Sequence, residues 1–341
     1  MAGLLEKVLH KSKSRSPQEL VLKTDNSIKK LSLNCSDHQV EDVARNLALM
    51  KVVFFGEGDV EPSKEHAIEL ARQACRSNFL SQVVQKLALL DFESRKDAAQ
   101  VCGAIVRMEA QGEYPGVRYV HEHPEIVPTL FAGYDNPAIA LNCGSMLRDC
   151  IRDESIARLV LEGPLFAEFF HKVEVTNFEV ASDAFTTFKD LLTRHKALVV
   201  NFLMTRYEEF FQQYSKLLES SNYVTRRQSL KLLGELLLDR ANVKVMMRYV
   251  SDAYNLRQMM LLLKDSSRSI QFEAFHVFKV FVANPNKPKP IVEILTGNQE
   301  KLLKYLTNFH TDKDDEQFKE EKVVIIKEIQ ALRPPTPTLP Q

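Results

Sequence analysis

Leu233-Gly234-Glu235-Leu236-Leu237 is one copy of a short pattern: a large apolar residue, two mostly polar or small positions, and an apolar pair. Four more copies begin at Cys102, Leu147, Phe188 and Phe278, and successive copies start 45, 41, 45 and 45 residues apart. A period of about 40–47 residues is typical of armadillo and HEAT units, whose two or three helices cannot bury their apolar faces alone. The sequence therefore predicts an all-α, armadillo/HEAT-like helical-repeat solenoid with a long concave surface suited to holding another protein.

Apolar residues around these copies recur at helical spacing. Phe185, Phe188 and Leu192 stand at positions i, i+3 and i+7, so their side chains would form one stripe along a helix. The same spacing recurs within residues 228–240 and 271–283. We expect a helix at each of these segments, with the stripe turned towards the protein core.

Three regions are expected along the chain. A basic flexible leader over residues 1–18 carries Lys11-Ser12-Lys13-Ser14-Arg15, and a helical-repeat domain follows over residues 19–332. Residues 333–341 contain four prolines, which cannot continue a helix, so we expect a disordered proline-rich tail there.

Composition narrows the class of protein. The 45 basic and 45 acidic residues leave a formal net charge of zero, which argues against a nucleic-acid partner, because such binding depends on an excess of basic groups. Five irregularly spaced cysteines are typical of reduced core thiols in a cytosolic or nuclear protein. No apolar run approaches the ~18 residues of a membrane span. We therefore predict a cytoplasmic protein with no membrane partner.

Sequence signatures of catalysis are missing: the chain lacks the glycine-rich phosphate-binding patterns, Gly-x-Ser-x-Gly and His-Glu-x-x-His. His121-Glu122-His123 is the one histidine cluster, and no further ligands at metal-binding spacing follow it. The acidic run 312–316 begins like a calcium loop, but Gln317 and Val323 stand where that loop requires glycine and glutamate. We predict that the protein is not an enzyme and has no cofactor and no metal.

Two groups of residues suit protein binding. Arg227, Lys231 and Glu235 are each four residues apart and share one helix face, where arginine can make bidentate contacts with a partner carboxylate. A solvated helix face is the alternative. Met259-Met260-Leu261-Leu262-Leu263 is the second group, with Lys301-Leu302-Leu303 expected near it. Methionine-rich helix ends form adaptable pockets for aromatic side chains, although ordinary core packing explains the same run.

Several segments resemble one known family. They include Tyr223-Val224-Thr225-Arg226-Arg227-Gln228-Ser229-Leu230, Phe275-His276-Val277-Phe278-Lys279 and Thr187-Phe188-Lys189-Asp190-Leu191-Leu192. The chain is similar there to the Mo-twenty-five scaffold family, also called calcium-binding protein thirty-nine, and the resemblance extends over residues 40–332. It implies a horseshoe of helical repeats that is not an enzyme and that binds kinases and pseudokinases of the Sterile-twenty group, holding them in an active-like conformation. The adaptor pseudokinase STRAD and liver kinase B form the best-known such assembly.

The resemblance also implies roles for individual residues on the concave face. Arg227 matches the family arginine that meets the kinase regulatory helix. Tyr223, Lys231 and Arg240 lie at matching positions and are expected to contribute to the same partner-binding face.

A second site implied by the resemblance is a pocket for the Trp-Glu-Phe tail of a pseudokinase. Met260, Asn298 and Lys301 match its positions, with Lys301 neutralising the acidic groups of the tail. Family members commonly carry a lysine where this chain has Gly297, so one favourable charge is lost here. The loop 110–115 matches the family poorly, and no role is transferred to it.

Other classes of binding protein make different predictions. An armadillo-type peptide or cargo adaptor unrelated to kinase activation would show a ladder of asparagines and tryptophans along its groove, and this chain has no tryptophan. A helical-repeat RNA binder would need a basic surface, and salt-sensitive RNA binding would reveal it.

Overall fold

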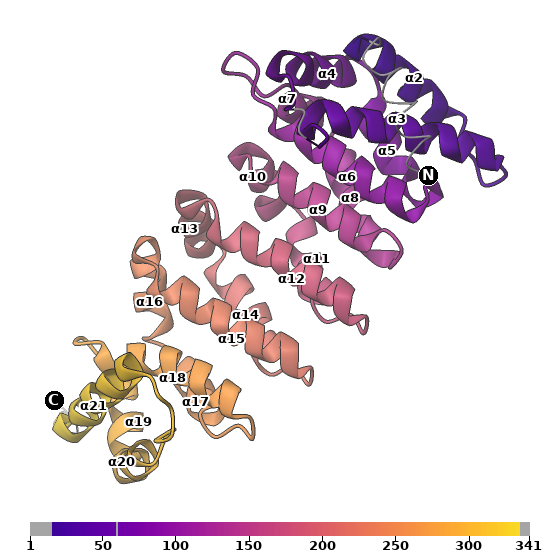
Figure 1. Cartoon of the computed structure of the whole chain (residues 1–341). Coiled ribbons are helices and arrows are strands. Elements are labelled where there is room, and N and C mark those ends of the chain that lie inside the picture. Colours follow the sequence, from indigo (N-terminus) through magenta and orange to yellow (C-terminus); the bar gives the residue numbers. More distant parts are fainter. Residues whose placement is uncertain (1–15, 59–60, 335–341) are drawn as a thin grey trace. The chain divides into compact units, whose positions relative to one another are not determined.

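A computed structural model describes residues 16–58 and 61–334, and over these residues the chain is helical (Figure 1). The predicted all-α helical-repeat class is confirmed: in the described residues, strand-like pairing is limited to isolated bridges such as the one between Ala110 and Glu113. The predicted leader and tail fall largely on residues 1–15 and 335–341, outside the described part. None of the described helices combines the length and apolar character that a membrane crossing requires.

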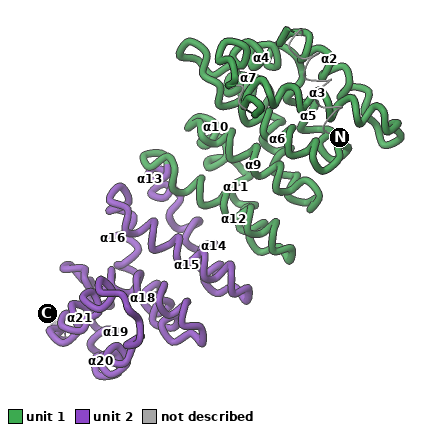
Figure 2. Tube along the Cα trace, viewed as in Figure 1, with its two compact units in different colours: residues 1–198 green, residues 199–341 purple. Residues whose placement is uncertain are grey.

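Two compact units divide the chain, the first ending at Leu198 and the second beginning at Val199 (Figure 2). The α-helices of the first unit are α2 (Pro17–Lys29), α3 (Asp37–Phe55), α4 (Lys64–Arg76), α5 (Phe79–Lys86), α6 (Phe92–Arg107), α7 (Pro115–Glu122), α8 (Ile126–Ala132), α9 (Ala140–Cys150), α10 (Glu154–Glu162), α11 (Leu165–Lys172) and α12 (Phe178–Thr193). Helix α13 (Lys196–Thr205) contains the boundary. The second unit has α14 (Tyr207–Leu218), α15 (Tyr223–Leu238), α16 (Val243–Tyr249), α17 (Ala253–Leu262), α18 (Arg268–Ala283), α19 (Lys289–Gly297), α20 (Gln299–Thr307) and α21 (Glu316–Ala331). Three short 3-10 turns supplement them: η1 (Leu87–Leu89), η2 (Gly133–Asp135) and η3 (Arg240–Asn242).

The recurring pattern lies near the end of the longest helix of each repeat, in α6, α9, α12, α15 and α18. Both its first residue and its apolar pair are buried in every copy. Two shorter helices precede the long one, as α16 and α17 precede α18, which is the three-helix unit of armadillo-like repeats.

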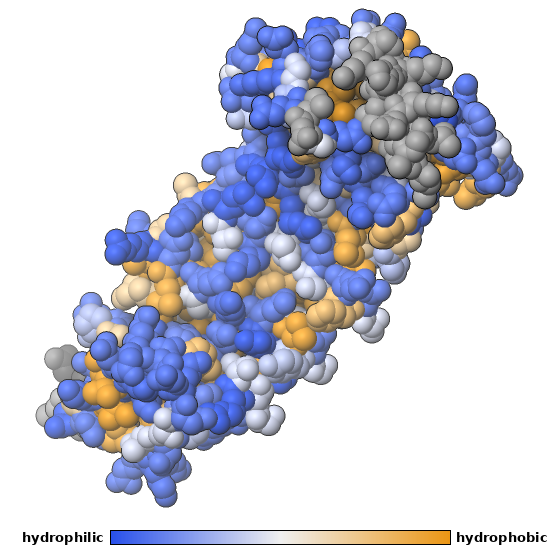
Figure 3. All heavy atoms as spheres, in the orientation of Figure 1, coloured by the Kyte–Doolittle hydropathy of each residue, from blue (hydrophilic) through white to orange (hydrophobic). Residues whose placement is uncertain are grey.

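On the face shown in Figure 3, hydrophilic side chains cover most of the surface and apolar patches are interspersed.

Successive long helices pack against one another within each unit: α3 on α6, α6 on α9 and α9 on α12 in the first, α15 on α18 and α18 on α21 in the second. Ion pairs join several of these neighbours. Arg148 of α9 forms a bidentate ion pair with Asp183 of α12, in which each of two guanidinium nitrogens lies 2.8 Å from a carboxylate oxygen. Lys279 of α18 lies 2.6 Å from Glu321 of α21. Removing one partner of such a largely buried pair is strongly destabilising, so these pairs help to specify which helix faces meet.

Candidate partner-binding surfaces

The predicted partner-binding residues lie in the second unit, on and just after α15. Arg227, Lys231 and Glu235 are exposed and recur every four residues, so they share one face of the helix. On its other side lies the predicted leucine stripe, which is buried against the unit: Leu230, Leu233 and Leu237. We call Tyr223, Arg227, Lys231 and Glu235 the α15 surface.

Local hydrogen bonding sets the start of this surface. Asn222 caps α15, because its side-chain oxygen accepts from the backbone N–H of Val224 at 3.0 Å. Tyr223, the first helical residue, is 41% exposed. Hydrogen bonds from Ser269 and Ser267 lower the pKa of the Tyr223 phenol, with a smaller contribution from Arg227. Tyr223 is therefore an exposed aromatic residue at the start of α15, near the first residues of α18.

The two neighbouring arginines have different environments. Arg226 is largely buried, lies 3.4 Å from the Asp265 carboxylate and donates to the Ser220 carbonyl at 2.9 Å. Arg227 is exposed. Arg226 therefore belongs to the packing between α15 and the loop before α18, and Arg227 is the solvent-exposed arginine of the two.

Glu273 of α18 is a neighbour of the α15 surface that sequence reasoning missed. Burial raises the pKa of its carboxyl group, while the charges of Lys231 and Arg227 act in the opposite direction. The carboxyl group of Glu273 therefore lies near enough to the two cations of α15 to be influenced by their charges. Glu273 stands five residues before the pattern copy at Phe278. No sequence pattern distinguishes it from other charged residues on a helix surface.

Arg240 stands apart from the other three predicted residues. It begins η3, after the end of α15, and is exposed. The 16 residues of α15 span about 24 Å at the rise of an α-helix. A partner contacting both Tyr223 and Arg240 would have to cover the whole length of the helix.

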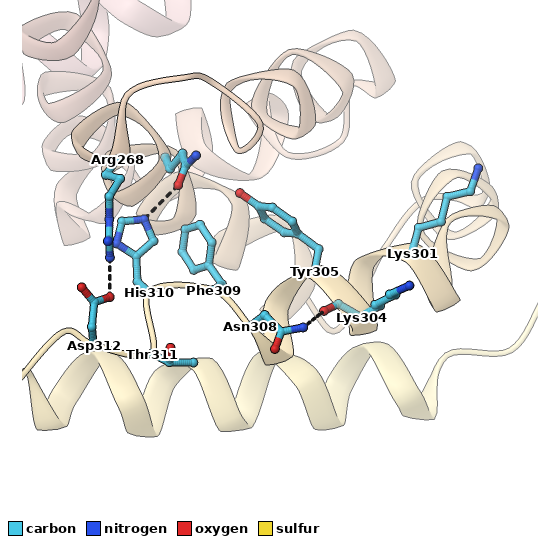
Figure 4. A pocket seen from close by; sticks show the side chains of 10 residues that line it. Arg268, Lys301, Lys304, Tyr305, Asn308, Phe309, His310, Thr311 and Asp312 are labelled. Atoms are coloured by element: carbon cyan, nitrogen blue, oxygen red, sulfur yellow. Dashed lines mark hydrogen bonds and ion pairs between the residues drawn. The ribbon is translucent and has the colours of Figure 1, made fainter.

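A cleft of about 660 Å³ lies further along the second unit. Residues from α18, α20 and the following loop line it: Arg268, Gln271, Lys301, Lys304, Tyr305, Asn308, Phe309, His310, Thr311 and Asp312. Figure 4 shows Arg268, His310 and Asp312 gathered at one end, Lys301 and Lys304 at the other, and two aromatic rings between them. We call this the C-terminal cleft.

The walls of the C-terminal cleft are held by tertiary contacts. Arg268 pairs with Asp312, and the His310 Nε2 lies 3.0 Å from the Gln271 side-chain oxygen. Tyr305 donates from its hydroxyl to the Leu263 carbonyl, and its ring centre lies 5.3 Å from that of Phe309. Burial lowers the pKa of His310, and the Arg268 charge adds to this effect. The imidazole is therefore neutral near pH 7, and the cations available to a ligand are at the lysine end.

Of the three residues predicted for the tail pocket, only Lys301 lines this cleft. Met260 is half-buried on α17, beside the fully buried Met259. Asn298 joins α19 to α20, and its amide donates to the Ile294 carbonyl at 2.8 Å. Gly297 ends α19, and a Cβ atom placed there would meet no atom within 4 Å.

Acidic side chains of the run 312–316 already interact with other groups of the protein. Asp312 pairs with Arg268, and Asp314 lies 3.3 Å from the Lys319 ammonium group. Asp315 caps α21 by accepting from the Phe318 N–H at 3.0 Å. Over residues 16–58 and 61–334, no three His, Cys, Asp or Glu side chains gather in a way that would hold a metal ion.

Comparison with known proteins agrees with the resemblance read from the sequence. A family model described as Mo25-like matches residues 8–333. The degreening-related dee76 protein of Auxenochlorella protothecoides is 62% identical over 87% of this chain and 92% of its own length. Mouse calcium-binding protein 39-like is 48% identical over 95% of this chain and 97% of its own. The Mo25-like protein of Schizosaccharomyces pombe is 44% identical over 95% and 99%.

Proposed function

Because this chain belongs to the Mo25-like family, we propose that it is a non-catalytic cytoplasmic scaffold that binds a Sterile-twenty-type kinase or a STRAD-like pseudokinase. The observation that carries this proposal is the α15 surface: an aromatic ring and two cations stand exposed along one rigid, well-capped helix. Buried leucines on the opposite side of α15 hold that helix in place. Such a preorganised surface loses little conformational entropy when a partner docks.

Kinase activation would follow from a difference in affinity. A scaffold that binds the active-like conformation more tightly than the inactive one shifts the population towards it. A preference of about 3 kcal/mol changes the ratio of the two conformations roughly 150-fold. Arg227 would supply part of this preference through a bidentate contact with a carboxylate that the partner presents only in its active-like conformation. A liver-kinase-B-type kinase would join such a complex as a third component in signalling.

The C-terminal cleft supports a second contact with the same partner. Its lysine end and its middle differ in chemistry: the exposed Lys301 and Lys304 suit an acidic side chain, and the half-buried ring of Tyr305 suits an aromatic one. A Trp-Glu-Phe-like tail offers both chemistries. Docking of that tail would raise the effective concentration of the kinase fold at the α15 surface.

The proposal is tested by measuring activation of a Sterile-twenty-type kinase and binding of STRAD with purified wild-type and Arg227→Ala proteins. We expect Arg227→Ala to lower affinity and activation at least about tenfold, the usual effect of losing a charge-assisted contact at the centre of an interface. Arg158→Ala is the matched control, because Arg158 is an exposed helical arginine in the first unit. Equal activation by the wild-type and Arg227→Ala proteins would contradict the proposal.

A further inference from the structure

A further pocket lies in the first unit, and none of its lining residues belongs to the α15 surface or the C-terminal cleft. It is a pocket of about 470 Å³ between α4, α7 and the turn that precedes α7. Three arginines line it: Arg72 and Arg76 from α4, and Arg118 from α7. We propose that this arginine pocket binds a phosphate monoester, presented by a phosphorylated side chain of a partner polypeptide.

The charges in the arginine pocket leave room for an oxyanion. Its two carboxylates, Glu113 and Glu122, are both exposed. Glu113 lies 3.4 Å from Arg118, a weak contact in water. Arg72 donates to the neutral side-chain oxygen of Gln111 at 3.0 Å. Within the described residues, neither Arg72 nor Arg76 forms an ion pair with a carboxylate. Guanidinium groups match phosphate oxygens in bidentate geometry, so a dianionic phosphate would complete this cluster.

The wall opposite α4 is a fixed tight turn. Ala110 and Glu113 exchange backbone hydrogen bonds of 2.8 and 3.3 Å, and the two residues between them, Gln111 and Gly112, have φ values of 60° and 82°. A left-handed conformation is uncommon for glutamine, and the hydrogen bond from Arg72 holds this side chain in place.

The floor of the pocket is also preformed. The Tyr119 ring is 3% exposed, and its hydroxyl lies 3.1 Å from the Ser81 hydroxyl. Burial raises the pKa of the neighbouring Cys75 thiol to about 12, so this cysteine stays protonated and is no nucleophile at neutral pH. A site whose walls do not have to rearrange binds its ligand without an ordering cost. The pocket therefore suits ligand binding rather than chemistry.

The lining residues favour a phosphorylated side chain over a nucleotide. The one aromatic residue of the pocket, Tyr119, is buried and offers no open face on which a base could stack. The small floor formed by Tyr119, Cys75 and Pro115 can receive the apolar stem of a side chain, while the arginines above it receive the phosphate. Inorganic phosphate shares the charged group and lacks the stem.

The test is isothermal titration of the full-length protein with sodium phosphate, with a pool of phosphoserine peptides, and with the same pool unphosphorylated. We expect saturable binding of phosphate, tighter binding of the phosphopeptide pool and no binding of the unphosphorylated pool. Arg76→Gln should weaken both interactions at least about tenfold, because a hydrogen bond to a charged group is lost. Amide NMR signals of Gln111 and Gly112 should shift on titration of the wild-type protein, and Arg76→Gln should need about ten times more ligand for the same shift.

Arg76 is exposed, so Arg76→Gln is expected to keep the native circular dichroism spectrum. The control is Arg158→Gln. Arg158 is an exposed arginine on α10, paired with Glu154 at 2.9 Å, and this variant should bind like the wild-type protein. Equal affinities for phosphate and phosphopeptides would contradict a polypeptide ligand and identify free phosphate as the ligand of the site. No saturable binding of either probe, or wild-type affinity in Arg76→Gln, would overturn the proposal. Arg227→Ala leaves this site intact, so the result is independent of kinase binding.

Discussion

The α15 surface and the C-terminal cleft are both parts of the second unit, yet they are built in different ways. The α15 surface takes its residues from one helix, so a spacing of four along the chain places Arg227, Lys231 and Glu235 side by side. The C-terminal cleft takes its residues from two helices and a loop. Arg268 and Asp312 meet across 44 positions of sequence. The difference shows that helical spacing predicts a surface on one element, while a cavity between elements depends on how they pack.

The two sites also depend on different stabilising interactions. The α15 surface depends on the repeat core beneath it, because buried leucines fix the rotation of the helix about its axis. The C-terminal cleft depends on polar contacts such as those between Arg268 and Asp312 and between His310 and Gln271. Substitutions that act on one of these supports should leave the other site largely unchanged.

The largest effect is expected from Leu233→Ala, which removes a fully buried side chain of α15. We expect the free energy of unfolding to fall by about 3 kcal/mol, because the lost apolar contacts and the cavity left behind both destabilise the core. Urea unfolding followed by circular dichroism measures this change. Leu238→Ala is the matched control on the same helix, since Leu238 is 53% exposed and its loss should cost less than about 0.5 kcal/mol. Equal losses for the two variants would show that the leucine stripe does not support α15.

Adjacent arginines provide the next test. Arg226→Ala leaves the largely buried Asp265 carboxylate without its cation and should lower the free energy of unfolding by about 2 kcal/mol, less than for a fully buried pair. Arg227→Ala removes an exposed side chain and should change stability by less than about 0.5 kcal/mol. Kinase binding should show the reverse order. If both variants lost the same stability, the division of roles between these two arginines would be wrong.

The recurring pattern accounts for how far the fold was predictable from sequence. It marks residues that are buried in five helices, because the same position meets the neighbouring repeat each time. A second regularity indicates where the helices begin. A polar residue stands 11 positions before every copy of the pattern: Asp91, Asn136, Asn177, Asn222 and Ser267. Asp91, Asn177 and Asn222 accept hydrogen bonds from the first turns of α6, α12 and α15. Reading this offset would have predicted where those helices begin.

The candidate sites were predictable only in part, for a physical reason. Lys301 was expected beside the methionine run. It lines the C-terminal cleft, but Met260 and Asn298 do not. A cleft is formed by side chains that meet across elements, and the spacing of residues along one helix does not predict such meetings. Glu273 has no sequence signal, because its importance comes from burial beside Lys231 and Arg227. The pairing of Arg226 with Asp265 is likewise a product of packing between α15 and the loop before α18.

A smaller effect is expected from restoring a charge near the C-terminal cleft with Gly297→Lys. No atom lies within 4 Å of the added Cβ position, so the new side chain should fit without strain. A Trp-Glu-Phe peptide should bind a few-fold more tightly, the gain typical of one exposed ion pair. Fluorescence polarisation with a labelled peptide measures it. Gly297→Ala separates the charge from the helix stabilisation that any non-glycine residue brings, and equal affinity of the two variants would assign no role to the charge.

The smallest effect concerns Glu273 and the pH dependence of stability. Because burial raises the pKa of this carboxyl group in the folded protein, its favourable contribution is complete below the unfolded pKa and is lost as the pH rises through the folded pKa. Glu273→Gln removes this loss. The variant should therefore gain stability relative to the wild-type protein between pH 3.5 and pH 7, by less than about 1 kcal/mol because the carboxyl group is only half-buried.

Urea unfolding at both pH values measures the gain, and a background variant identifies its cause. Arg227 opposes the effect of burial on Glu273, so the gain from Glu273→Gln should be larger when Arg227 is already alanine. An unchanged gain in the Arg227→Ala background would mean that the two side chains do not interact across α15 and α18. The charge of Arg227 would then play no part in setting the pKa of Glu273.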